Sequence, residues 1–253
     1  MTSTTTGSDE PILRAVGLTR RFGGLTAVNG LDFTVRRGEL LGLIGPNGAG
    51  KTTLFNMLMG LTPPSAGEIF LESSRINGLK PHQVCRRGMV KTFQNVALFP
   101  ELTVMDNVLT GALLRLSLRE ARALALVNLE KVGMAHIAGK RAADLTFPEK
   151  ALVEMARALC TQPKVVLLDE VMAALNHAEM DQVLALIRKL RDEEGLTFLV
   201  IEHHMRAIMN LCDRILVLCF GQLIAQGTPT EISRDPAVIS AYLGADLAEE
   251  HAR

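Results

Sequence analysis

The segment GPNGAGKTT at residues 45–53 decides the fold of this chain, because it joins three glycines to a lysine and two threonines. The residues that satisfy the pattern G-x-x-x-x-G-K-[ST] are Gly45, Gly50, Lys51 and Thr52. Glycine allows positive φ angles, so successive backbone N–H groups of such a loop can turn inward around an anion. The run ELLGLIG before the loop is typical of a buried strand, and KTTLFNMLMG after it is typical of a helix. The segment therefore predicts a phosphate-binding loop at a helix N-terminus.

The same loop predicts which residues hold a nucleotide. Lys51 can reach the β- and γ-phosphates, and the Thr52 hydroxyl can hold a magnesium ion. The residues expected to bind ATP here are Gly45, Pro46, Asn47, Gly48, Ala49, Gly50, Lys51, Thr52 and Thr53. A glycine-rich turn with a chance lysine is the alternative, and the flanking strand and helix disfavour it.

Composition narrows the class of protein. The chain has 253 residues, 48% of them hydrophobic, and its 27 basic and 27 acidic residues give a formal net charge of zero. Without a basic excess, and with no tryptophan and one tyrosine, a nucleic-acid partner is not expected. The longest uncharged runs, 52–67 and 215–230, have sixteen residues each and contain glycine and proline. They are too short to span a membrane, so any membrane role is expected to come through a partner.

The termini and the cysteines carry little function. Residues 1–10 are polar and have no apolar stretch, which predicts a flexible tail rather than a signal peptide. The four cysteines form no C-x-x-C pair and lie in apolar segments, so we expect reduced, buried thiols in a cytosolic protein. These residues are Cys85, Cys160, Cys212 and Cys219.

Short apolar strands alternate with helices along most of the chain, which indicates an α/β sheet with helices on its faces. Strands are expected at residues 12–22, 30–35, 67–71, 89–94, 164–170, 196–203, 214–221 and 222–227. The segment from 102 to about 160 has no expected strand, and its helices are expected at 104–116, 118–133 and 149–160. A further helix at 180–195 should end at Gly195. The pattern predicts a helical block inserted into an α/β core, which disfavours a small P-loop kinase.

Polar residues at the ends of three expected strands complete the predicted site. VVLLDE ends in Asp169, which fits the magnesium-supporting aspartate of P-loop enzymes, and in Glu170, which can orient an attacking water. Gln94 ends the strand before the helical block and can bind the metal or water. His203 ends a later strand and can donate to the γ-phosphate. A metal site at His203 and His204 is disfavoured, because no third ligand is apparent.

These motifs occur in the order found in ABC-transporter ATPase subunits, which the chain resembles from about residue 13 to 244. The motifs that carry the resemblance are the phosphate loop, Gln94, LTFPEKALVEMARAL, VVLLDE, AALN and IEHH. The stretches RRFGGLTAVNGLDFTV, KTFQNVALFPELTVMDNVLTG and CDRILVLCFGQLIAQGTPTEISRDPAVISAYLG look like the branch that serves importers of branched-chain and other hydrophobic amino acids.

The resemblance implies an α/β P-loop NTPase (RecA-like) core with an antiparallel β subdomain and an inserted α-helical subdomain. The implied division is 1–10 as a tail, 11–94 and 163–244 as the core, 95–162 as the helical subdomain and 245–253 as a second tail. Phe22 would stack on adenine and Val28 would touch the sugar. The loop that couples two subunits would contain Ala174, Leu175 and Asn176. Two ATPs would lie between two subunits, each held by one phosphate loop and the partner's signature motif.

The chain departs from the family's pattern in its signature motif. That motif usually reads L-S-G-G-Q, or L-S-Y-G-E/Q in this branch, and here it is Leu145, Thr146, Phe147, Pro148 and Glu149. Thr146 and Glu149 form a T-x-x-E capping box, and a proline is tolerated in a first helical turn. Pro148 nevertheless lacks one N–H that would face the partner's γ-phosphate. Either this is a subfamily variant, or the signature serves its partner's ATP poorly.

Taken together, the resemblance implies an ATPase that powers import of branched-chain or other hydrophobic amino acids, with ATP and Mg²⁺ as cofactors. Lys51, Glu170 and His203 would act in hydrolysis, and Thr52, Gln94 and Asp169 would hold the metal. The implied partners are a second ATPase subunit in a homo- or heterodimer, membrane permease subunits and, indirectly, a periplasmic solute-binding protein. The chain would lie in the cytoplasm on the inner face of the membrane. The alternatives are an ABC-type ATPase unrelated to transport and a weakly hydrolysing regulatory subunit.

Overall fold

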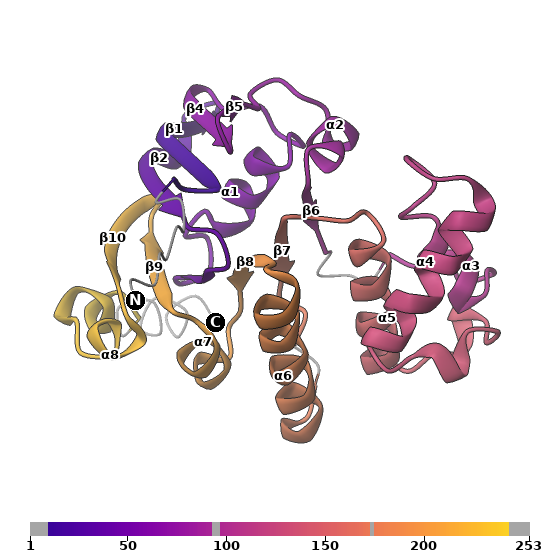
Figure 1. Ribbon diagram of the computed structural model, residues 1–253. Helices are drawn as coiled ribbons and strands as arrows, with labels where there is room; N and C mark the ends of the chain where they lie inside the picture. Colours follow the sequence, from indigo (N-terminus) through magenta and orange to yellow (C-terminus); the bar gives the residue numbers. More distant parts are fainter. Residues whose placement is uncertain (1–9, 93–96, 173–174, 243–253) are drawn as a thin grey trace, which may run out of the picture.

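The computed structural model of the chain describes residues 10–92, 97–172 and 175–242. Its strands form two sheets (Figure 1). The first sheet is antiparallel and has the order β2 (Leu25–Val35), β1 (Leu13–Phe22), β4 (Ala66–Leu71), β5 (Ser74–Arg75). The second has the order β10 (Gln222–Gly227), β9 (Arg214–Cys219), β3 (Leu40–Ile44), β8 (Thr197–Ile201), β7 (Val165–Asp169), β6 (Met89–Lys91).

The second sheet is parallel except for β10, which pairs antiparallel with β9. Every residue of β3, β7 and β8 is buried, as expected for parallel strands covered on both faces. Alternate residues enter two cores, because side chains alternate along a strand. Leu41 and Leu43 pack in the core shared with α1 and the antiparallel sheet, whereas Leu40 and Ile44 pack on the other side, in the core that contains α6 and α7.

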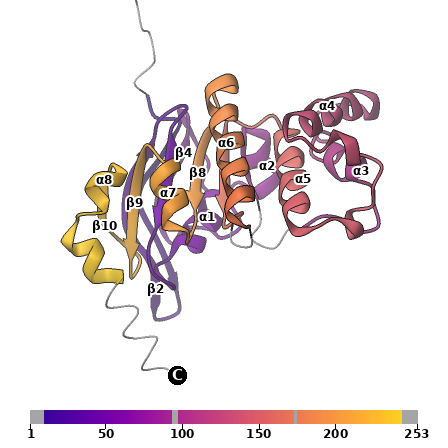
Figure 2. The same cartoon turned by 90° about the horizontal axis from the view of Figure 1, so that it is seen from below.

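The helices cover both faces of this sheet and extend past one edge. Their bounds are α1 (Lys51–Leu58), α2 (Pro81–Arg86), α3 (Val104–Leu109), α4 (Leu118–Lys131), α5 (Phe147–Leu159), α6 (His177–Glu194), α7 (Met205–Leu211) and α8 (Pro229–Ile232). In Figure 1, α6 and α7 lie on the opposite side of the sheet from α1 and the antiparallel sheet. Figure 2 shows α3, α4 and α5 grouped beyond the edge, away from β10 and α8. The division into subdomains at 95 and 162 stays a prediction.

Several element bounds differ from those expected. The helix expected at 104–116 ends at Leu109. Gly111 follows, and a Cβ on it would overlap the carbonyl oxygen of Arg157, so the chain there runs against the backbone of α5. The strand expected at 89–94 is described as far as Lys91, and residues 93–96 lie outside the described ranges. Three short helices, α2, α7 and α8, were not predicted, because each is too brief to show a clear periodicity.

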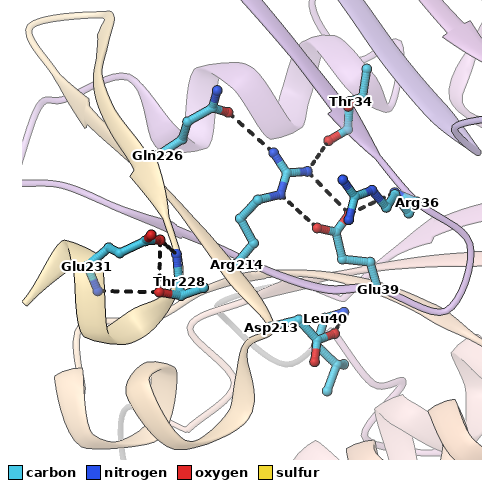
Figure 3. Close-up of polar contacts among 9 residues, drawn as sticks. All are labelled: Thr34, Arg36, Glu39, Leu40, Asp213, Arg214, Gln226, Thr228 and Glu231. Atoms are coloured by element: carbon cyan, nitrogen blue, oxygen red, sulfur yellow. Dashed lines mark hydrogen bonds and ion pairs between the residues drawn. The ribbon is translucent and has the colours of Figure 1, made fainter.

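Arg214, at the start of β9, joins the two sheets (Figure 3). Its guanidinium donates to Glu39 Oε1 at 2.8 Å and to the Thr34 carbonyl oxygen at 2.6 Å. A third bond reaches Gln226 of β10 at 3.3 Å. The Glu39 carboxylate also accepts from the Arg36 N–H at 2.7 Å. This network fixes the turn between β2 and β3 at the amino ends of the parallel strands, opposite the ends that build the site.

Candidate nucleotide-binding and active site

The carboxyl ends of β3, β8 and β7 meet at one edge of the sheet. Leu43 pairs with Ile201, and Ile201 pairs with Asp169. The segment after β3 leads into α1, and the segments after β7 and β8 carry acidic and histidine side chains. Ligands of open α/β sheets bind at this edge, and the three segments predicted from the sequence therefore come together there.

The loop between β3 and α1 has the conformation that its glycines allow. Gly45, Gly48 and Gly50 have φ angles of 150°, 75° and 100°. Residues other than glycine rarely adopt such positive φ angles. A Cβ on Gly45 would overlap the carbonyl oxygen of Leu218, and a Cβ on Gly50 would overlap that of Ala27. Gly48 has open space at its Cα. The first and last glycines are therefore required by packing, whereas Gly48 leaves the loop open on the ligand side.

Lys51 begins α1 and is 7% exposed. Its ammonium group donates to the carbonyl oxygens of Gly45 at 2.6 Å and Pro46 at 3.1 Å. Burial lowers the pKa of Lys51, and the charges of Glu170 and Asp169 oppose this effect. The cation is thus held inside the loop with two carboxylates nearby, which suits a group that meets a polyphosphate.

Glu170 and His203 come from two neighbouring strand ends and contact each other. His203 Nε2 lies 2.8 Å from Glu170 Oε1, and the Glu170 N–H donates to the Ile201 carbonyl oxygen at 2.9 Å. Glu170 has a φ of 53°, a left-handed conformation that is uncommon for a residue with a side chain. Strained backbone of this kind clusters at active sites, and here it accompanies a carboxylate that faces the phosphate loop.

Asp169 is more deeply buried than Glu170. Its side chain is 2% exposed, and Oδ2 lies 2.8 Å from the ammonium nitrogen of Lys91. Oδ1 is buried and has no hydrogen-bond partner within the described ranges. A buried carboxylate oxygen without a partner is costly, so Oδ1 is suited to a cation or to a water that a cation holds.

A cavity of about 350 Å³ connects the phosphate loop with Glu170 and His203, and Asp169 lies just outside its lining. It is lined by Phe22, Leu25, Ala27, Asn47, Gly48, Ala49, Gly50, Lys51, Thr52, Thr53, Glu170 and His203. Phe22 is 44% exposed on its wall, where an aromatic ring could meet a base. Val28 is fully buried and is not among the lining residues. Ala27 lies on the wall instead, and the sugar contact expected for Val28 stays a prediction.

Other predicted site residues lie away from this cavity. The segment 145–149 contributes none of its lining. Thr146 caps α5, accepting from the Glu149 N–H at 3.4 Å, while the Thr146 N–H donates to Glu149 Oε2 at 2.7 Å. The predicted capping box is therefore confirmed. Asn176 caps α6 and Leu175 is buried just before it. Gln94 and Ala174 lie outside the described residues, and their roles stay predictions.

Three residues near the site were not predicted from the sequence. Lys91 pairs with Asp169. Glu202 is 2% exposed and accepts from the Met172 N–H at 2.7 Å. Burial raises the pKa of Tyr242, while a backbone hydrogen bond with Gly45 opposes that rise. The sequence gives no local sign of these contacts, because each joins residues that are distant along the chain.

The chain matches two protein families. The ABC transporter family matches residues 28–173, and the branched-chain amino acid ATP-binding cassette transporter family matches residues 222–248. The high-affinity branched-chain amino acid transport ATP-binding protein BraF of Pseudomonas aeruginosa is 43% identical over 250 residues, which cover 92% of this chain and 98% of that protein.

Solved structures agree with this relationship. The ADP conformation of MJ1267, an ATP-binding cassette of an ABC transporter, has a TM-score of 0.85 at 30% identity, covering 92% of this chain and 99% of that one. The dimeric bacterial ABC transporter cassette MJ0796 has a TM-score of 0.77 at 25% identity, covering 86% and 98%. The predicted P-loop NTPase fold is confirmed. No helix among residues 10–92, 97–172 and 175–242 is long and apolar enough to cross a membrane. The chain therefore belongs to the ABC transporter family, in which it is an ATP-binding cassette that hydrolyses ATP.

Proposed function

We propose that this chain powers the uptake of branched-chain or other hydrophobic amino acids through separate membrane subunits. The observation that carries the proposal is the 43% identity with BraF along nearly the full length of both chains. The match of residues 222–248 to the branched-chain transporter family supports the same substrate class. An ABC-type ATPase unrelated to transport is the alternative, and these matches do not favour it.

In the proposed reaction, the loop at 45–53 holds the phosphates through its N–H groups and through Lys51. Mg²⁺, when bound, would neutralise charge on the phosphates. Thr52 and Asp169 are the residues proposed to hold it, and Gln94 is proposed as a further ligand. The fit rests on Asp169 Oδ1, which is buried without a partner in the described part of the chain, and on Thr52, which lines the cavity beside Lys51.

Glu170 is proposed to orient the water that attacks the γ-phosphate and to accept its proton. His203, which lies 2.8 Å from Glu170, would contact the γ-phosphate and keep the carboxylate in place. Phe22 is proposed to stack on the adenine from the wall of the cavity. A positioned base of this kind typically contributes about 10²–10⁴ in rate.

The proposed assembly places two ATPases face to face, each completing the other's site with its signature segment at 145–149. The similar cassette MJ0796 is dimeric, which supports the pairing of two cassettes. The residues 174–176 would couple the two subunits of this homo- or heterodimer. Permease subunits would anchor the pair at the inner face of the membrane, and a periplasmic solute-binding protein would deliver the amino acid.

The test is Glu170→Gln in the complex with its permease subunits, reconstituted in vesicles. We expect ATP binding within about twofold of wild type and ATPase activity reduced by at least about 10². Uptake of labelled leucine should fall with it. The control is Glu72→Gln, because Glu72 pairs with Arg37 and Lys164 on the surface and should leave both activities unchanged. Full turnover by Glu170→Gln would refute its role, and ATP hydrolysis without amino acid uptake by the wild type would favour the alternative.

A further inference from the structure

The ion pair between Lys91 and Asp169 is almost completely buried. Their side chains are 7% and 2% exposed, and the ammonium nitrogen lies 2.8 Å from Oδ2. Burying two charges is costly unless they are paired in good geometry. A pair at this depth, on a residue proposed to hold the metal, therefore calls for an explanation beyond surface electrostatics.

The sheet itself brings the two residues together. Lys91 lies opposite Leu167 in the parallel pairing of β6 and β7, and Asp169 is two positions further along β7. Residues two apart share a face of the sheet and lie about 7 Å apart along the strand. The lysine stem bridges this gap. A shorter cation at position 91 would not reach Oδ2, so the residue type fits the geometry.

Lys91 also contacts the helix that follows the phosphate loop. Its ammonium nitrogen lies 3.5 Å from Asn56 Oδ1 and 5.8 Å from the centroid of the Phe55 ring. Thr92 adds a second tie, because its N–H donates to the Leu167 carbonyl oxygen at 2.9 Å. The position of Asp169 is thus fixed from β6 and α1 together, and not from its own strand alone.

The two oxygens of Asp169 are in different environments as a result. Oδ2 is bound by Lys91, whereas Oδ1 has no hydrogen-bond partner within the described ranges. A carboxylate tied by one oxygen cannot rotate freely, so the other oxygen keeps a fixed direction. Removing a group that orients a metal ligand in this way typically lowers the metal affinity by about 10–100-fold.

We propose that Lys91 is a positioning residue of the ATPase site, which holds Asp169 through Oδ2 and directs Oδ1 toward the metal that accompanies ATP. The proposal rests on the metal role given to Asp169 under the proposed function. Lys91 itself is not among the residues that line the nucleotide cavity. It acts by fixing the direction of a carboxylate that otherwise turns between two orientations.

The experiment compares Lys91→Met and Lys91→Arg with wild type in the full complex. Three quantities are measured: ATP binding in the presence of EDTA, the Mg²⁺ concentration for half-maximal ATPase activity, and Mn²⁺ affinity by EPR with a non-hydrolysable ATP analogue. We expect Lys91→Met to weaken Mn²⁺ binding and raise the Mg²⁺ requirement about tenfold or more. Metal-free ATP binding should stay within about twofold, because the phosphate loop is intact. Lys91→Arg keeps the charge and an N–H donor and should restore most of the metal affinity.

The matched control is Lys131→Met, which removes a lysine that pairs with Glu194 at the same 2.8 Å distance but with both side chains about one-third exposed. It should change none of the three quantities. If Lys91→Met does not fold, Lys91→Gln is measured in its place. Unchanged metal affinity in a folded, charge-free variant would overturn the proposal and leave the pair a purely structural one. A wild type that hydrolyses no ATP at any Mg²⁺ concentration would instead refute the proposed function.

Discussion

At the residue scale, Glu202 shows how a buried acid is stabilised next to the active site. It follows the last residue of β8 and precedes His203. Oε1 accepts from the Met172 N–H at 2.7 Å, and Oε2 is buried without a partner among the residues described. Burial raises the pKa of Glu202 to about 7, and the nearby charges of Glu170 and Asp169 add to the rise. The carboxyl is therefore protonated in the native state below neutral pH.

This pKa predicts a pH dependence of stability. The unfolded pKa of Glu202 is near 4.5 and the folded value is about 7, so the native state binds more protons between these values. Stability from this group is complete below about pH 4.5 and is lost as the pH rises through 7. Glutamine at this position cannot ionise. The free energy of unfolding of Glu202→Gln, relative to that of wild type, should therefore rise by up to roughly 3 kcal/mol across this interval. Urea unfolding at several pH values between 5 and 9 measures the difference.

Glu231→Gln provides the control for this titration. Glu231 caps α8, and its hydrogen bonds with Thr228 lower its pKa. Its contribution to the free energy of unfolding is therefore complete above the unfolded pKa. The difference in free energy of unfolding between Glu231→Gln and wild type should therefore stay constant from pH 5 to 9. If the difference between Glu202→Gln and wild type were also constant over this pH range, it would contradict the prediction.

At the scale of an element, the first turn of α5 decides how much the signature segment can offer a partner's ATP. The helix begins at Phe147. The Glu149 N–H bonds to Thr146 Oγ1 at 3.4 Å, and Pro148 has no N–H. At most one N–H of the first three residues can then face an anion, whereas helix N-termini that bind phosphate usually offer several.

Pro148→Gly should therefore raise the ATPase activity of the assembled complex. The added N–H can donate a charge-assisted hydrogen bond, which is worth roughly 1.5–3 kcal/mol when fully made, or roughly 10- to 150-fold in rate. Pro229→Gly is the matched control, because Pro229 lies in the first turn of α8 behind the same kind of capping box and outside the cavity. Equal activity of Pro148→Gly and wild type in a complex that hydrolyses ATP would show that Thr146 and the helix dipole suffice.

At the scale of the whole molecule, Arg214 holds the two sheets in a fixed relation (Figure 3). Its side chain is 21% exposed and that of Glu39 is 6% exposed. Removing the arginine leaves Glu39 buried with fewer partners, which typically costs about 3–5 kcal/mol. The network lies at the opposite end of the parallel strands from the cavity, so its loss should affect stability rather than nucleotide binding.

Arg214→Met should therefore lower the free energy of unfolding by roughly 3 kcal/mol, with ATP affinity unchanged. Arg75→Met is the comparison, because its pair with Glu68 is exposed, at 57% and 47%, and such pairs contribute about 0–1 kcal/mol. Denaturant unfolding and ATP titration measure the two effects. A loss no larger than that of Arg75→Met would show that the two sheets are held by their apolar core alone.

The sequence alone determined the parts of this protein that depend on local pattern. The phosphate loop, the acidic end of β7, the capping box at Thr146 and the inserted helices could all be predicted, because spacing and periodicity are properties of a short stretch. The short helices α2, α7 and α8 and the true end of α3 could not. A helix of four to seven residues shows little periodicity, and α3 ends where Gly111 meets the backbone of α5.

Only the tertiary structure decided which charged groups meet. Lys91 is 78 positions from Asp169 and reaches it through the register of two parallel strands. Glu202 meets Met172 because β7 and β8 are neighbours, and Val28 is buried next to Gly50. The physical reason is the same for the two contacts and for the burial of Val28. Local sequence sets backbone conformation and chemistry, whereas burial, and with it the cost of each charge, is set by segments that are distant along the chain.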